Sequence, residues 1–364
     1  MLVIAAAAAS RPCTASVRVN GRLGSARIET TVDSEQTKYL VANYLTGHRS
    51  RPAFDAEIDA LRSRNLTDSR TVSDISRTWS PDFAAVLLAE YLIEHNARVQ
   101  QLFDAHVAAA TSIGRRRAIA DRASGLTVLL VPGWLYRRHP ETGAALEEEL
   151  RTMRRLGVSA ERVATSENGS VEANARIISA TIRAVRDDRM IIVSASKGGP
   201  ETLLALQALQ PDERERVAAW INVGGILHGT ALADKALAIP RRWLTGLLLL
   251  RHCEGVVSMT TYAANSRQQL PLDDVMIVNF VAIPLSGDLT AETRSGYCAL
   301  REHGPNDGLT LITDAIQPHS LTITALGSDH FFRSLPAEKR AIALLETVLD
   351  LLDRTTVRAN SSSS

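Results

Sequence analysis

A serine follows an apolar run in the stretch IIVSASKGGP, residues 191–200, and its surroundings suit a nucleophile. Ser194 and Gly198 lie two residues before and two residues after Ser196, and both are small. A sharp strand-to-helix turn requires small residues at these positions, because neighbouring backbone passes close to them, and it exposes the serine hydroxyl. Pro200 indicates that a helix begins directly after the serine, since proline is tolerated only in the first turn of a helix. The stretch therefore predicts a reactive Ser196 at the end of a strand.

A serine hydroxyl is a weak nucleophile at neutral pH, so it needs a base within hydrogen-bond reach and a third group that orients the base. In an α/β arrangement the acid and then the histidine follow the serine, each after a later strand. Asp307 lies in the loop PNDGL, and of the nine histidines only His319 and His330 follow it. His330 also follows the last predicted strand, so we expect the order Ser196, Asp307, His330. Asp288 is the alternative acid, because it lies closer to the end of its strand.

The elements that position these residues begin at about residue 125, where short β-rich runs alternate with longer helical stretches. This alternation is typical of a mostly parallel sheet built from βαβ units and flanked by helices, so the predicted fold class is α/β. The predicted strands lie within 126–133, 158–165, 190–196, 217–225, 274–284 and 320–328. Predicted helices include 143–157, 170–188 and a closing helix over 337–355.

A second region precedes the sheet and has the apolar spacing of helices. The stretches 35–45, 52–64 and 80–110 repeat apolar residues at intervals of three and four, and the last begins with Ser80 as N-cap and Pro81 in its first turn. We expect a helical N-terminal region that packs or dimerises rather than taking part in catalysis.

The predicted organisation of the whole chain follows from these patterns. It comprises an N-terminal segment over 1–34, a helical region over 35–120, the α/β domain over 121–356 with an insertion over 226–272, and a disordered tail over 357–364. The segment MLVIAAAAAS at the start has an apolar core but lacks the basic residues of a secretory signal, so it leaves both a signal remnant and a cytoplasmic protein open.

Four motifs together, VPGWLY, SASKGG, PNDGL and SDHF, resemble those of the α/β-hydrolase superfamily of serine esterases and lipases. The resemblance covers about residues 125–354 and implies an α/β-hydrolase fold. It implies Ser196 as the nucleophile, His330 as the general base and later acid, and Asp307 as the orienting carboxylate. Ser194 departs from the glycine that the family usually has there, but serine is small enough to fit.

The same resemblance implies an oxyanion hole made of two backbone N–H groups. Lys197, directly after the nucleophile, provides one donor, and Trp134 of VPGWLY provides the other, with Leu135 as its alternative. In lipase-like enzymes an apolar insertion at the position of 226–272 acts as a lid, so its segment WLTGLLLL, residues 243–250, is either part of a lid or part of the core.

The composition gives no indication of nucleic-acid binding, of a zinc site or of a membrane span. The chain of 364 residues contains 41 Lys and Arg against 40 Asp and Glu, a net charge of +1, so nothing indicates a nucleic-acid partner. Three cysteines form no disulfide framework or zinc motif, and no stretch is long and apolar enough for a transmembrane span. We expect no metal and no cofactor.

The expected function is that of a serine hydrolase that cleaves a carboxylic ester, such as a lipid or other acyl ester, through an acyl-enzyme on Ser196. A peptidase or amidase, an acyltransferase with the same three residues, and a catalytically silent binding protein are the alternatives. The acyl length, the oligomeric state and the compartment do not follow from the sequence.

Overall fold

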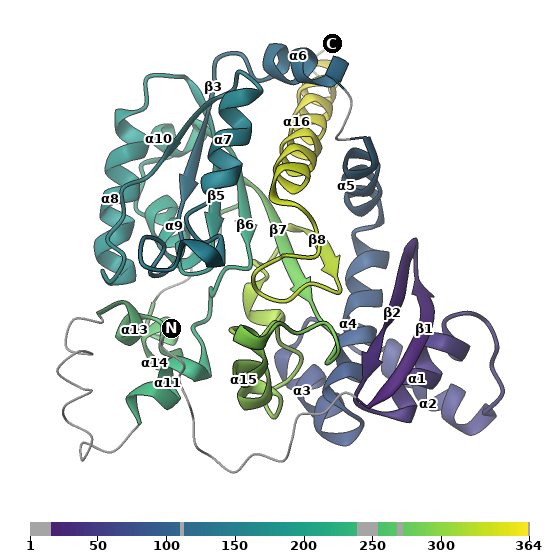
Figure 1. Ribbon diagram of the computed structural model, residues 1–364. Helices are drawn as coiled ribbons and strands as arrows, with labels where there is room; N and C mark the ends of the chain where they lie inside the picture. The colour runs from purple at the N-terminus through teal and green to yellow at the C-terminus, as the bar shows by residue number, and fades with distance from the viewer. Residues whose placement is uncertain (1–15, 110–112, 239–253, 268–271, 363–364) are drawn as a thin grey trace.

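A six-stranded sheet forms the centre of the structure, a computed structural model that describes residues 16–109, 113–238, 254–267 and 272–362 (Figure 1). Neighbouring strands are all parallel, in the order β4-β3-β5-β6-β7-β8. The strands are β3 (Leu126–Val131), β4 (Ser159–Arg162), β5 (Arg189–Ala195), β6 (Val217–Val223), β7 (Met276–Ile283) and β8 (Leu321–Leu326). The six predicted strands and the predicted α/β class, with a mostly parallel central sheet, are confirmed.

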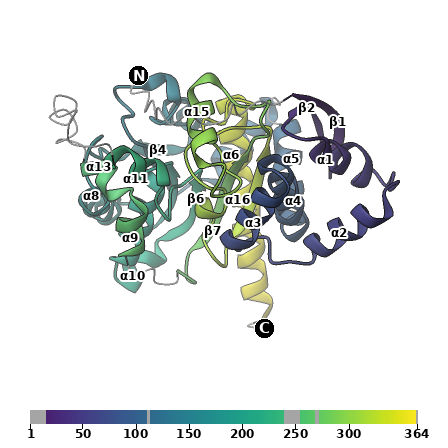
Figure 2. The same ribbon diagram turned by 90° about the horizontal axis from the view of Figure 1, so that it is seen from below.

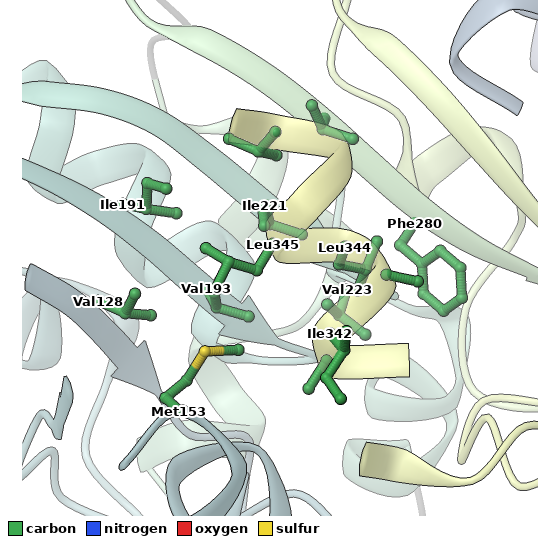
Figure 3. Close-up of a cluster of buried hydrophobic side chains, with 14 of the residues drawn as sticks. Val128, Met153, Ile191, Val193, Ile221, Val223, Phe280, Ile342, Leu344 and Leu345 are labelled. Carbon is green, nitrogen blue, oxygen red and sulfur yellow. The ribbon is translucent and has the colours of Figure 1, made fainter. Parts of the chain in front are cut away.

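Helices cover both faces of the sheet, because its strands have apolar side chains on both sides. One face packs against α5 (Ala97–Ala109), α6 (Ile113–Arg122), α7 (Glu147–Arg155) and α16 (Ala337–Ser362). The other face packs against α8 (Val171–Ala184) and α9 (Gly198–Gln207). Alternate strand residues divide between the two faces, since Val128 belongs to the first apolar cluster and Leu129 to the second. Figure 3 shows the first cluster, in which Leu345 of α16 lies over Ile221 and Val193.

The N-terminal region lies at the β8 side of the sheet, opposite α8 and α10 (Pro211–Glu215) (Figures 1 and 2). Its elements are β1 (Val17–Leu23), β2 (Ala26–Val32), α1 (Glu35–Tyr39), the π-helix η1 (Leu40–Tyr44), α2 (Pro52–Arg62), α3 (Ser69–Thr78) and α4 (Pro81–His95). It has its own apolar cluster, to which β7 contributes Val281 and Ile283. The region therefore shares its core with the edge of the central sheet.

The structure differs from the expected organisation in this region. Residues 17–32 form an antiparallel hairpin, whereas no strand was predicted before residue 35. Ser80 caps α4, as predicted, and accepts a hydrogen bond from the Phe83 N–H at 3.1 Å. The helix expected over 80–110 ends at His95, however, and the next helix, α5, packs on α16 and the sheet instead.

The C-terminal helix α16 extends further than expected. It continues to Ser362, so most of the tail predicted as disordered over 357–364 is helical. The apolar start of the chain lies outside the described residues. Within the described ranges, no helix is both long and apolar enough to cross a membrane.

Candidate active site

Ser196 lies between β5 and α9, at the carboxyl edge of the parallel sheet. Its backbone has a φ of 52°, a left-handed conformation that costs energy for a residue other than glycine. Within 190–203 Ser196 is the one residue that is not buried. A Cβ on Gly198 would lie 2.8 Å from the Val131 carbonyl oxygen, which explains why this position requires glycine.

The other small residue of the turn has a partner of its own. Ser194 is fully buried, and its Oγ accepts a hydrogen bond from Trp220 Nε1 at 2.8 Å. The serine therefore fits where the resemblance led us to expect glycine. The helix α9 begins at Gly198, with Lys197 as its N-cap residue, in agreement with the start that Pro200 indicated.

His330 follows β8 and reaches the serine. The distance between His330 Nε2 and Ser196 Oγ is 2.9 Å, within hydrogen-bond range. The imidazole is buried, and the His330 backbone N–H donates to the Asp307 carbonyl oxygen at 2.9 Å. The adjacent Asp329 fixes the same turn, because its carboxylate accepts hydrogen bonds from Thr290 and Thr293 at the start of α15 (Ala291–Leu300). Sequence reasoning missed Asp329, since its partners lie almost forty residues away.

Asp307 contacts the other ring nitrogen. Its Oδ2 lies 2.7 Å from His330 Nδ1, and its Oδ1 accepts hydrogen bonds from the Leu309 and Thr310 N–H groups at 2.9 and 2.8 Å. Both oxygens are therefore committed, and the carboxylate holds one orientation. Asp288 instead accepts from the Leu285 N–H within its own loop, so of the two predicted acids Asp307 is the one that contacts the histidine.

The electrostatics of the histidine reflect two opposing causes. Burial by itself lowers the pKa of His330, but the charge of Asp307 and its hydrogen bond to the ring raise it, with a smaller contribution from Asp329. The net result is a pKa above the ordinary value for histidine. Asp307 thus favours the imidazolium that forms when the ring accepts a proton.

The loop after β3 passes close to the serine. A Cβ on Gly133 would lie 3.3 Å from the Ser196 Cβ and from the Ala195 carbonyl oxygen, so this glycine allows the loop to pass close to the nucleophile. Trp134 follows it directly, and Leu135 has a φ of 53°. Of the two predicted oxyanion donors, Lys197 directly follows Ser196, and Trp134 directly follows the glycine that lies beside it.

The insertion is described in part and packs against this loop. Its helices α11 (Ala231–Leu237) and α13 (Glu254–Ser258) form a small apolar cluster against Trp134. The helix α14 (Thr261–Asn265) follows. The segment 243–250, predicted as lid or core, lies outside the described residues. Among the residues that the structure describes, no group of three or more His, Cys, Asp or Glu side chains could hold a metal ion.

Comparisons with known proteins agree with this architecture. No protein-family model and no curated protein matches the sequence. Among solved structures, a carboxyl esterase of metagenomic origin is 22% identical with a TM-score of 0.50, over 64% of this chain and 76% of that one. A Bacillus licheniformis lipase in its mature form is 20% identical with a TM-score of 0.46, over 56% and 84% of the two chains. With its parallel six-stranded sheet flanked by helices, the chain therefore has the α/β-hydrolase fold.

Proposed function

We propose that the protein is a serine hydrolase that cleaves a carboxylic ester through an acyl-enzyme on Ser196. The observation that carries this proposal is the continuous line of hydrogen bonds from Asp307 through His330 to Ser196. It begins at a buried, immobilised carboxylate and ends at the one residue of the turn that is not buried. This is the geometry of an activated nucleophile, its base and the group that orients the base.

The reaction follows from these positions. His330 Nε2 takes the Ser196 proton as Oγ attacks the ester carbonyl, and Asp307 stabilises the imidazolium. The backbone N–H groups of Lys197 and Trp134 then hold the negatively charged oxygen of the tetrahedral intermediate. His330 protonates the leaving alcohol, and water repeats the sequence to release the acid.

The surroundings of the oxyanion loop favour a substrate with an acyl chain. Buried apolar side chains from the loop after β6 and from the insertion pack with Trp134, next to the proposed donor. They are Ile226, Ala233, Ala236, Val256 and Met259. An alkyl group bound near these residues would lie beside the reacting carbonyl, which favours a lipid or other acyl ester over a charged substrate.

A fluorophosphonate probe tests the nucleophile directly. We expect the wild type to be labelled and Ser196→Ala to remain unlabelled. Ser124→Ala, which changes an exposed serine in the turn before β3, should be labelled like the wild type. Labelling that persists in Ser196→Ala would refute the assignment.

Substrate class is tested separately, with p-nitrophenyl esters of short and long acyl chains. We expect turnover that depends on Ser196 and increases from short to longer chains. Cleavage of small amides without cleavage of either ester would show that the protein is an amidase.

A further inference from the structure

The lysine after the nucleophile has a buried charged side chain. Lys197 and Glu201 are each only 1% exposed, and Lys197 Nζ forms an ion pair with Glu201 Oε1. Asn174 Nδ2 donates to the same oxygen at 2.7 Å, while among the described residues Glu201 Oε2 has no hydrogen-bond partner. Burial raises the pKa of Glu201 to about 7, although the charge of Lys197 opposes this.

Such a pair needs an explanation other than stability. The cost of removing two charges from water often equals or exceeds their attraction, so apolar residues of similar volume would stabilise the fold equally well. The pair also lies next to strained backbone, because Lys197 directly follows Ser196, and Ser196 has a φ of 52°. Backbone strain of this kind persists only where the surrounding contacts fix it.

The contacts of the pair extend to a second helix and to the loop after β4. Glu201 lies four residues after Lys197, so the ion pair spans the first turn of α9. Asn174 of α8 is in turn fixed by hydrogen bonds to the N–H and the carbonyl oxygen of Ser166, both at 2.9 Å. The Lys197 side chain is thereby connected to a second helix and to the loop after β4.

The helix α13 of the insertion approaches the end of the lysine side chain. A Cβ on Gly255 would lie 3.2 Å from Lys197 Cε and 3.2 Å from Trp134 Nε1. The lysine stem therefore lies close to the indole of the second proposed oxyanion donor. The side chain is held at its end by the ion pair, and Gly255 lies close to its Cε.

We propose that the Lys197–Glu201 ion pair is a positioning device that fixes the Lys197 backbone N–H in the direction needed to donate to the oxyanion. The inference rests on the proposed function, because it assigns a role within the same site. The pair acts through the backbone of Lys197, and its charges do not contact the substrate.

The test replaces both charges together. Single substitutions leave an uncompensated buried charge and can prevent folding, whereas Lys197→Met combined with Glu201→Leu leaves none. For this double variant we expect a melting temperature near that of the wild type and a kcat lowered about 10- to 100-fold, with little change in KM. The Ki of a trifluoromethyl ketone, whose hemiketal oxygen occupies the oxyanion position, should rise by the factor by which kcat/KM falls.

The control removes a more exposed ion pair elsewhere. Arg62 and Glu90 pair in the N-terminal region at 2.8 Å, so Arg62→Met combined with Glu90→Leu should keep the wild-type kcat and Ki. Lys197→Met combined with Glu201→Gln also leaves no buried charge and keeps an acceptor for Asn174 Nδ2, so it should show the same loss of kcat and provides the test if the first double variant does not fold.

The outcomes separate the two proposals. Wild-type kcat and Ki in a folded double variant would overturn the positioning role while leaving the serine hydrolase intact. A wild type that fluorophosphonate fails to label would overturn the proposed function, and this inference with it.

Discussion

Two buried carboxylates, Asp307 in the candidate active site and Asp82 in the N-terminal region, are each surrounded by hydrogen-bond donors. Asp82 Oδ1 accepts from the Ser286 N–H and Oγ, both at 2.9 Å, and from the Tyr297 hydroxyl at 2.8 Å. Its Oδ2 accepts from the Asp33 N–H at 2.9 Å. These bonds join α4 and the end of the hairpin to the loop after β7 and to α15.

The two sites differ in what the carboxylate contacts. The donors to Asp82 hold their protons at any ordinary pH, and burial raises the pKa of Tyr297 further. Asp307 instead gives one oxygen to an imidazole, which titrates near neutral pH and reaches a partly exposed hydroxyl. The buried carboxylate of Asp82 and its donors Asp33, Ser286 and Tyr297 therefore have a structural role, and we call this group the Asp82 joint. The hydrogen bonds of Asp307 instead lead through a titratable base to a serine hydroxyl, which indicates a catalytic role.

Asp307→Asn should have the largest effect, because it breaks the active-site line while preserving its shape. The Asn carbonyl oxygen would keep the Leu309 and Thr310 N–H groups, which turns the amide N–H toward His330 Nδ1. The ring would then carry its proton on Nε2 and could not accept the Ser196 proton. We expect kcat to fall about 10⁴-fold with little loss of stability.

The control for this prediction is Asp288→Asn, which changes the alternative acid of the sequence analysis. Because Asp288 is bonded to Leu285 in its own loop and to Thr30 of β2, and not to His330, kcat should stay near the wild-type value. A large loss of kcat in Asp288→Asn with an active Asp307→Asn would reverse the assignment. Both are measured as steady-state ester hydrolysis alongside thermal unfolding.

Gly198→Ala should have the next largest effect, because it moves the nucleophile. The new Cβ would meet two backbone oxygens, of Val131 at 2.8 Å and of Pro132 at 3.0 Å, and neither can move without shifting β3 or the oxyanion loop. We expect kcat/KM to fall about 100-fold, the effect of a displacement of roughly 1 Å.

Ser194→Gly changes the other flank of the same turn and makes it smaller. It leaves Trp220 Nε1 unpaired, so we expect a loss of about 1–3 kcal/mol in stability and nearly unchanged kcat/KM. If the two variants lost activity equally, steric demand at Gly198 would not explain the turn.

The sequence indicated which residues meet in the candidate active site, but it did not indicate the contacts of Asp82. Ser196, Asp307 and His330 each lie in a loop or turn associated with a strand, so local patterns place them at one edge of a parallel sheet. Asp82 bonds to residues more than 200 positions away, and no local pattern indicates those partners.

The missed elements have similar physical causes. In the hairpin over 17–32, β1 alternates exposed and buried residues throughout, but β2 does so only in its first half. The buried face of α3 has only two apolar residues, Val72 and Ile75. The Lys197–Glu201 spacing of four residues is visible in the sequence, but the same spacing commonly occurs on solvated helix faces. Only the structure shows that both charges are buried.

Tyr297→Phe should lower the stability of the protein through the Asp82 joint and leave kcat unchanged. It removes one of three hydrogen bonds to Asp82 Oδ1, all of them buried, and we expect a loss of about 1–3 kcal/mol in unfolding free energy. Tyr262→Phe, at a residue that is 84% exposed, is the matched control and should change nothing. Denaturant unfolding measures the effect, and an unchanged midpoint for Tyr297→Phe would show that the joint does not stabilise the fold.

The smallest effect concerns the dependence of stability on pH, which Asp82 illustrates. Burial and the charge of Asp33 raise the pKa of Asp82 to about 7, from an ordinary value of 3.8. Between these values the folded state holds a proton that the unfolded state has lost, so stability falls as pH rises through this window. Glu201 and Asp314, also raised to about 7, act in the same direction. His330, with its raised pKa, likewise stabilises the fold at low pH and loses this contribution as pH rises through its folded pKa.

Activity should change in the opposite direction, because His330 must be neutral to accept the serine proton. Its raised pKa means that kcat/KM increases with pH through a value above the ordinary 6.5. We therefore expect the melting temperature to fall by about 2–4 °C between pH 5.5 and 8 while kcat/KM rises. Asp82→Asn, which cannot titrate, should reduce the fall in melting temperature and leave the pH profile of kcat/KM in place. A variant that shifted the activity profile as well would show that the joint and the active site titrate as one system.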